Sequence, residues 1–191
     1  TGTSNFTLVG ASSNTVGVTF VATGPTTGSG TVVDPNIPSV ASYVFVTDER
    51  FLIAMGCNDA VSGSLVQDPM FLAWSDQENP QVWTPAITNQ AGSNRFTYGS
   101  RLIAAMKQRQ EILIWTDAAL YSMQFVGAPY VYGFYVISNE ITIVSPNAAT
   151  TANNITYWMG QDKFYAYSGR VDTLPCSLRQ YIFDDINTQQ W

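Results

Sequence analysis

The amino-acid sequence predicts an all-β fold made of antiparallel strand meanders, with one short helix near the C-terminus. Short apolar runs with alternating or β-branched residues recur along the chain, and tight polar turns separate them. Of the 191 residues, 46% are hydrophobic and 13% aromatic, whereas only 12% are charged, about half of the usual ~25%. A chain of this length and composition can bury a core, and disorder is excluded.

The first 40 residues differ from the rest of the chain. No charged residue precedes Asp34, and the alternating segments 6–9 and 16–21 predict a β-hairpin. A Gly- and Pro-rich stretch at 24–38 is typical of a linker. We therefore expect an uncharged hairpin arm or insertion with its linker at 1–40, and a strand-rich domain at 41–191.

From residue 41 onward the pattern predicts short strands in sequence-adjacent pairs. Asp48, Glu49 and Arg50 form a three-residue hairpin loop between the runs 43–47 and 51–55. One meander is predicted over 102–106, 112–116 and 120–125, and another over 155–159 and 164–167 with a turn toward Val171. After Pro175 the apolar residues fall at helical spacing, so 177–187 is predicted as an amphipathic helix capped by Ser177.

The meanders resemble one another. Residues 50–54 are similar to 101–105, residues 74–76 (WSD) to 115–117 (WTD), and residues 54–56 to 158–160. Imperfect repeats of ~40–50 residues, each a strand meander, are typical of β-propeller blades. Residues 41–191 would hold about three blades, which do not close a ring of ~4–8 blades, so we expect the remainder outside this sequence. A single β-sandwich is the alternative.

Histidine is absent from the sequence, which excludes Ser-His and Cys-His nucleophile pairs and every histidine metal ligand. Cys57 and Cys176 are too few for a four-thiolate zinc site or a disulfide framework. We expect two buried thiols, with one bridge as the alternative. We predict no enzyme, no catalytic residue, no metal and no cofactor.

Paired carboxylates are the remaining route to catalysis. The adjacent pairs 48–49 and 184–185 cannot face one sugar across the ~5–9 Å that glycoside hydrolysis needs, because neighbours on a strand or helix point in different directions. Three other aspartates lie near predicted turns: Asp76, Asp117 and Asp162. If they converge, the chain is a propeller glycosidase, our third hypothesis; otherwise each bonds the backbone of its own turn.

The densest aromatic cluster consists of Tyr130, Tyr132, Phe134 and Tyr135. Glycine and proline residues at 127, 129 and 133 interrupt it, which favours a loop or an irregular strand. The cluster is a stacking surface for sugars or bases, a subunit contact, or core between two sheets.

The net charge of −6 and the pI of about 4.3 argue against specific nucleic-acid binding, because the eight Lys and Arg residues form no basic stripe. An acidic wall that repels DNA remains compatible with this charge. No apolar run approaches the ~18 residues of a spanning helix, so we expect no membrane insertion.

An ordered series of short motifs resembles one known family. The motifs are 71–83 (FLAWSDQENPQVW), 112–116 (ILIWT), 120–121 (LY), 127–129 (GAP), 132–134 (YGF), 145–148 (SPNA), 157–160 (YWMG), 162–165 (DKFY), 169–171 (GRV) and 181–187 (YIFDDIN). Over about residues 42–191 this succession resembles the packaged-DNA stabilisation proteins of short-tailed bacteriophages, also called tail nozzle or hub proteins. Members of that family are usually much longer.

The resemblance implies a propeller subunit of a homo-oligomeric ring, a hexamer, below the portal in the tail of the virion. Such a ring would seal the DNA exit channel, retain the genome, and contact portal or adaptor proteins and tail spikes or fibres. Genomic DNA would pass through the lumen without specific binding. The alternative hypothesis is a carbohydrate-binding, receptor-binding propeller module that stacks sugars on residues 130–135.

Overall fold

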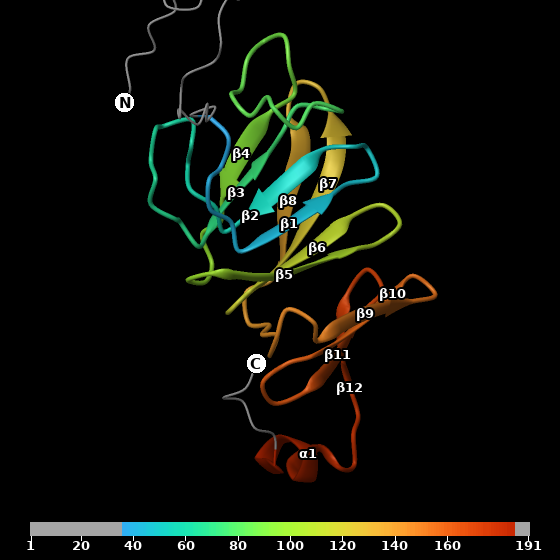
Figure 1. Ribbon diagram of the computed structural model, residues 1–191. Coiled ribbons are helices and arrows are strands. Elements are labelled where there is room, and N and C mark those ends of the chain that lie inside the picture. Colours follow the sequence, from blue (N-terminus) through green and yellow to red (C-terminus); the bar gives the residue numbers. More distant parts are fainter. Residues whose placement is uncertain (1–35, 186–191) are drawn as a thin grey trace, which may run out of the picture. The chain divides into compact units, whose positions relative to one another are not determined.

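The structure of the chain is a computed structural model that describes residues 36–185. The hairpin arm and the linker up to residue 35 lie outside the described residues, as do residues 186–187 of the expected helix. In the described part, twelve strands form three four-stranded antiparallel sheets, and one helix follows them (Figure 1). Each sheet is a meander of four consecutive strands, so the mostly-β architecture that the sequence predicts is confirmed.

The first sheet contains β1 (Tyr43–Val46), β2 (Leu52–Met55), β3 (Phe71–Trp74) and β4 (Gly92–Arg95). The β1–β2 loop has the predicted three residues, and the Thr47 N–H donates to the Phe51 carbonyl at 2.9 Å to close it. The last loop residue, Arg50, has φ of 68°, the left-handed conformation that such loops require.

The second sheet contains β5 (Leu102–Lys107), β6 (Ile112–Thr116), β7 (Leu120–Gly127) and β8 (Val131–Ser138). β8 is an eight-residue strand that pairs with β7 with two register shifts, which agrees with the irregular strand, one of the two alternatives that the sequence predicted. The register of the β7–β8 pairing shifts between Leu120 and Tyr121 and between Phe125 and Gly127, as it does at β-bulges.

The third sheet contains β9 (Ala149–Ala152), β10 (Ile155–Met159), β11 (Phe164–Tyr167) and β12 (Val171–Leu174), and α1 (Arg179–Asp185) follows it. The helix begins two residues later than predicted. Its Phe183 ring contacts the Phe164 ring of β11 at 5.2 Å, which attaches the helix to this sheet.

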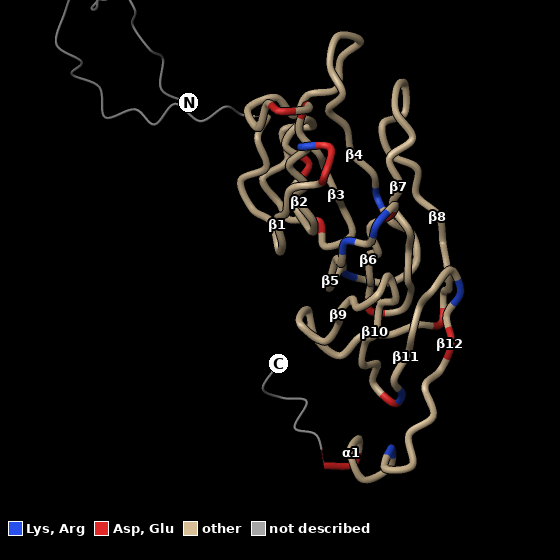
Figure 2. Tube along the Cα trace, turned by 90° about the vertical axis from the view of Figure 1, so that its right-hand side faces the viewer, with Lys and Arg blue, Asp and Glu red and all other residues tan. Residues whose placement is uncertain are grey.

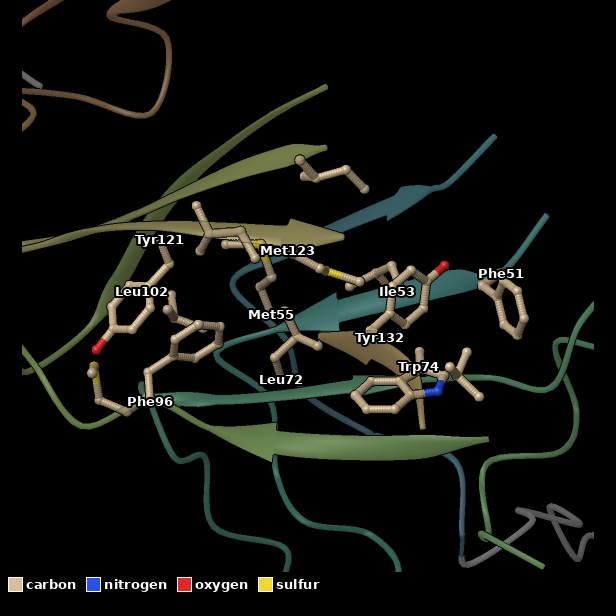
Figure 3. Close-up of a cluster of buried hydrophobic side chains, with 14 of the residues drawn as sticks. Phe51, Ile53, Met55, Leu72, Trp74, Phe96, Leu102, Tyr121, Met123 and Tyr132 are labelled. Carbon is tan, nitrogen blue, oxygen red and sulfur yellow. The ribbon is translucent and has the colours of Figure 1, made fainter. Parts of the chain in front are cut away.

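The first and second sheets pack through an apolar layer, here called the first core (Figure 3). Its fully buried members include Phe51, Ile53, Met55, Leu72, Phe96, Ile114 and Met123. Aromatic rings meet edge to face at both ends of the layer: Tyr132 lies 5.4 Å from Trp74, and Tyr121 lies 4.7 Å from Phe96. Such ring pairs add directional contacts to the burial of apolar area.

The second and third sheets pack through a second core. Its most buried members are Leu113, Trp115, Leu120, Ile143 and Trp158. The Trp115 ring meets the Trp158 ring edge to face at 5.4 Å, and Tyr165 stacks on Trp158 at 5.2 Å. The second sheet therefore contributes one face to each core, as the strand period of two allows.

The outer face of the first sheet is covered by a small third cluster. Ala54 and Ala73 of the sheet contact Cys57 and Trp83, which lie outside the strands. Trp83 belongs to the β3–β4 loop, and its indole N–H donates to the Pro80 carbonyl at 2.7 Å. Neither cysteine is in a disulfide: Cys57 is buried as predicted, and Cys176 is half-buried.

Most of the similar sequence segments lie in strands that have different places in the order of their sheets. Residues 50–54 lead into the second strand of a sheet, whereas residues 101–105 lead into a first strand. Residues 74–76 end a third strand and 115–117 end a second strand; only 54–56 and 158–160 correspond. The likeness reflects a strand-to-turn motif that is used repeatedly, and three stacked sheets alone do not establish a propeller.

Candidate functional site

The β7–β8 hairpin carries the four aromatic residues that the sequence singled out, and strand alternation separates them. Tyr132 is buried and Phe134 is half-buried, and both belong to the first core. Tyr130 is 78% exposed in the hairpin turn, and Tyr135 is 53% exposed on the strand. The structure therefore places two of the rings in the core, and a contact or stacking role stays a prediction for the other two.

Tyr132 joins the first two sheets. Its hydroxyl lies 3.0 Å from the Thr47 hydroxyl, and its ring packs edge to face against Phe51 at 5.5 Å and Phe125 at 5.8 Å. Burial raises the pKa of the Tyr132 phenol above its ordinary value. Tyr132 is therefore a buried structural residue whose one polar atom is satisfied.

Tyr135 is the better placed of the two exposed rings. It lies over Gly133, where a Cβ atom would be only 2.9 Å from the Tyr135 hydroxyl oxygen. Because any larger residue at 133 would displace the ring, Gly133 holds this exposed aromatic surface close to the strand. A pre-positioned ring of this kind can stack on an apolar sugar face or on a partner side chain.

A small charged pocket lies between the β1–β2 and β5–β6 turns. Lys107 Nζ and Asp48 Oδ1 bridge the two turns at 3.3 Å, and Tyr132 and Phe125 contribute to the lining. Asp48 and Lys107 are both substantially exposed, so this ion pair contributes little to stability.

A polar network, which the sequence did not indicate, lies beside the second core. Glu111 accepts a hydrogen bond from the Ser122 hydroxyl, and Gln108 Nε2 donates to Thr156 Oγ1 at 2.6 Å, joining the second sheet to the third. Burial, together with the Glu111 carboxylate, raises the pKa of Tyr167 to about 12. Glu111 stands in a polar turn before the apolar run 112–115, so the local sequence is that of an ordinary turn residue.

The three aspartates considered for glycoside hydrolysis each have partners in their own surroundings. Asp76 Oδ1 accepts from the Gln90 N–H at 2.9 Å, and Asp162 Oδ2 lies 3.7 Å from Arg179 Nη2. Asp117 accepts hydrogen bonds from the Ser100 hydroxyl and from the Ser100 N–H at 2.7 Å. Although burial opposes ionisation, these hydrogen bonds outweigh it and hold the pKa of Asp117 below its ordinary value. The partners lie in other segments of the chain, so these carboxylates link separate segments instead of bonding the backbone of their own turns as the sequence predicted.

The outer face of the third sheet is apolar in its two central strands and polar at its edges. The register places six half-buried apolar residues on this side: Ile155, Tyr157, Met159, Phe164, Ala166 and Leu174. The same register places the exposed residues Thr150, Ala152 and Asp172 of the edge strands on it. Phe183 of α1 contacts this face at Phe164, and in the described part no sheet packs on it.

An open groove lies where the first strands of the first two sheets begin. Its lining consists of Ser42, Tyr43, Gln67, Pro69, Ser100, Arg101, Leu102, Ile103, Val144 and Pro146. Arg101 is the only charged residue of this lining, and Tyr43 is 43% exposed. Exposed Tyr and Arg beside apolar residues are typical of protein contact surfaces.

The charges of the described part are sparse and lie mainly in turns and at strand ends (Figure 2). Within residues 36–185, no group of three or more Cys, Asp or Glu side chains is arranged to hold a metal ion. Nor does the described part contain a helix with the length and hydropathy needed to cross a bilayer.

The comparisons with known proteins provide no relative. No protein-family model matches the chain, and no curated protein is significantly similar to it. The resemblance to phage tail nozzle proteins therefore rests on the ordered motif series.

Sequence reasoning missed the groove and the most exposed apolar side chains of the chain. Ile87 is 105% exposed and Leu65 is 81% exposed, and both lie in long loops of the first sheet. A weak signal was available for Ile87, because it stands alone among turn-forming residues, outside any alternating pattern.

Proposed function

We propose that the chain is a structural protein of the virion of a short-tailed bacteriophage, a subunit of the ring-forming tail nozzle or hub below the portal. In this role it seals the DNA exit channel and retains the packaged genome. One observation carries the proposal beyond the motif series. Three consecutive four-stranded meanders stack through apolar faces, and the outer face of the third carries half-buried apolar side chains on its central strands β10 and β11.

The order of stacking supports a partial β-propeller. The face of β2 with Ile53 and Met55 meets the second sheet, and the equivalent face of β6 with Leu113 and Trp115 meets the third. The first strands of the second and third sheets, β5 and β9, lie close together. Sheets that stack in chain order, each on the next, are the building principle of a propeller.

The charge and chemistry of the chain suit this role. A net charge of −6 with few cations lets DNA slide past a lumen wall without being held by its phosphates. The family that the motif series resembles implies a homo-oligomeric ring, a hexamer, and closed cyclic symmetry is the usual form of such assemblies. The partners are then portal or adaptor proteins on one side and spikes or fibres on the other.

Cryo-electron microscopy of the intact virion tests the proposal. We expect three stacked four-stranded sheets per subunit in a ring around the axial channel. Density for the chain at a spike tip or on the capsid face would contradict this placement.

A carbohydrate-binding role is the second candidate, because Tyr130 in the β7–β8 turn and Tyr135 on β8 are both exposed. Glycan-array binding that Tyr135→Ala abolishes would favour it. Tyr98→Ala, which removes another exposed tyrosine (47% exposed), is the matched control. Tyr132 is unsuitable for this test because it is buried in the first core.

A further inference from the structure

The second sheet ends in a free edge. β8 is the last strand of this sheet, and in the described part it pairs with β7 on one side only (Figure 1). Between its two register shifts the pairing is regular from Tyr132 to Val136. A free edge presents backbone groups to which another extended chain can bind.

The hydrogen bonds of the β6–β7 hairpin show which way the backbone groups of β7 point. The Thr116 N–H donates to the Ala119 carbonyl at 2.9 Å, so these two residues face each other across the hairpin. Along an antiparallel strand, successive residues bond to opposite sides. The register Leu113↔Ser122 therefore directs the backbone groups of Ser122 away from β6 and toward β8.

The same alternation identifies the outward groups of β8. Ser122 is paired with Tyr135, so Tyr135 and Gly133 bond to β7. The N–H and C=O groups of Phe134 and Val136 then point away from β7. In the described part no backbone or side-chain group bonds to them, so β8 offers two donors and two acceptors along its free edge.

The other sheet edges of the described part are protected in ways that natural proteins use against strand addition. β4 carries Arg95 and β12 carries Asp172, and β5 and β9 lie close to each other. β1 is uncharged but has only four residues. β8 has eight residues, and no charged residue occurs in the chain between Asp117 and Glu140. Its edge therefore lacks the usual protection.

Exposed apolar side chains accompany these backbone groups. Tyr135 is 53% exposed and Val136 is 46% exposed, and they point to opposite faces because side chains alternate along a strand. The Phe134 ring packs against Phe96 at 5.5 Å and against Trp74 at 6.0 Å, which holds the strand to the first core. A strand held in place before binding loses little conformational entropy when a partner arrives.

The chemistry of the edge specifies its partner. Donors and acceptors that alternate along an extended strand are matched by another extended backbone. Because the hairpin contains no charge, a charged partner side chain would lose water without gaining an ion pair, so the partner segment is uncharged. A single segment needs only the spacing of about 4.8 Å between neighbouring strands, whereas β8 of a second copy would bring another first sheet to the same face.

We propose that β8 accepts an extended, uncharged segment of a different protein as a fifth strand of the second sheet. The backbone of this segment bonds to Phe134 and Val136, and its side chains cover Tyr135 and Val136. The inference concerns this edge alone and goes beyond the proposed place of the chain in a phage tail. Cryo-electron microscopy of the virion decides that place separately.

Peptide binding to the full chain tests the proposal. The probe is a fluorescein-labelled synthetic peptide with the uncharged sequence of β7, LYSMQFVG. By fluorescence anisotropy we expect a dissociation constant of about 100 µM or lower. The same peptide with all its amides N-methylated cannot donate hydrogen bonds and should bind at least ~10-fold more weakly. Equal binding of the two peptides, or no binding of the first at ~1 mM, overturns the inference.

A pair of proline variants locates the bound peptide. Val136→Pro removes one outward N–H, and an edge strand tolerates proline at such a position. We expect it to weaken peptide binding about tenfold while the urea midpoint of unfolding stays close to that of the wild type. Val44→Pro is the matched control, because it removes an outward N–H from the free edge of β1, and it should bind the peptide like the wild type. Equal binding by the two variants overturns the placement on β8.

Amide hydrogen exchange in the wild-type chain decides the point without any variant. By NMR, the N–H groups of Phe134 and Val136 should exchange faster than those of Gly133 and Tyr135, which bond to β7. Saturating peptide should slow both outward amides at least ~10-fold. Unchanged exchange with the peptide bound would mean that it packs on exposed rings instead. Slow exchange without the peptide, together with dimers in analytical ultracentrifugation, would place a second copy at the edge. Either result overturns the inference.

Discussion

The second and third sheets have similar strands but different environments. In β6 (ILIWT) all five residues are buried, because the first sheet covers one face and the third sheet covers the other. In β10 (ITYWM) buried residues alternate with half-buried ones, because only one face is covered by a sheet. Both strands are almost entirely apolar, so the difference lies in what packs on them rather than in their own residues.

This comparison shows how a stack of sheets distributes its stability. A residue in the middle of the stack loses all contact with water, whereas the same residue at the end keeps part of it. Since hydrophobic stabilisation follows the apolar area removed from water, equal substitutions should have unequal effects in the two sheets. The following predictions test this difference, from the largest effect to the smallest.

Removal of Trp115 should have the largest effect. Its side chain is fully buried in the second core against Trp158, so Trp115→Ala is expected to lower the free energy of unfolding by ~3–5 kcal/mol. Urea denaturation followed by circular dichroism measures it. A loss below ~1 kcal/mol would mean that the second and third sheets do not pack as described.

A matched pair of isoleucines sharpens the comparison. Ile114 of β6 is fully buried, whereas Ile155 of β10 is half-buried on the outer face of the third sheet. We expect Ile114→Ala to destabilise the chain by ~3 kcal/mol and Ile155→Ala by ~1 kcal/mol, in the same urea assay. Equal losses would show that another surface covers the third sheet in solution.

Removal of the Tyr132 hydroxyl should lower the free energy of unfolding by a smaller but measurable amount. Tyr132→Phe removes its hydrogen bond with Thr47 inside the first core, with an expected loss of ~1 kcal/mol in unfolding free energy. Tyr135→Phe, on the exposed side of the same strand, is the control and should change it by less than ~0.3 kcal/mol. Similar values for the two variants would argue against this burial pattern.

Acid should weaken the Ser100–Asp117 link between the segment before β5 and the β6–β7 turn. The pKa of Asp117 is lower in the folded chain than its ordinary value of 3.8, so ionised Asp117 stabilises the fold above that pH. That contribution disappears as the pH falls below 3.8 through the folded pKa. Asp117→Asn should therefore show a shallower loss of stability between about pH 4 and pH 2 than the wild type, by less than ~1 kcal/mol. Parallel pH profiles would contradict the assignment.

The last test compares the reactivity of the two thiols in the folded chain. Cys57 is buried under the first sheet, and burial raises its pKa to about 11, whereas Cys176 is half-buried after the third sheet. At pH 8 we expect iodoacetamide to modify Cys176 at least ~10-fold faster than Cys57, measured by mass spectrometry of intact protein. Cys176→Ser should abolish the fast phase. Equal rates would mean that the first sheet opens readily.

The strands predicted correctly are those whose own residues are apolar. β2, β6, β10 and β11 coincide with apolar runs bounded by turn residues, and the hairpin at Asp48 has the predicted length. β4 (GSNR) and β9 (ATTA) were missed, because both are edge strands with few apolar residues. Pairing with a neighbouring strand, which local sequence does not encode, makes them strands.

The candidate sites show the same division. The sequence located the aromatic cluster at Tyr130–Tyr135, but the pleat of β8 decided that Tyr132 faces the core and Tyr135 faces solvent. The groove brings together residues from four separate segments, at 42–43, 67–69, 100–103 and 144–146, and no spacing rule connects them. Only the stacking of the sheets creates it.

By itself, the sequence determined the class of fold, most of the strand positions, the absence of histidine chemistry and the acidic charge of this protein, because composition and local periodicity express these directly. The tertiary structure alone decided which apolar faces are covered, which aromatic rings remain exposed, and where the groove lies. The physical reason is that burial depends on what packs against a residue, and the residues that pack here are distant in the chain.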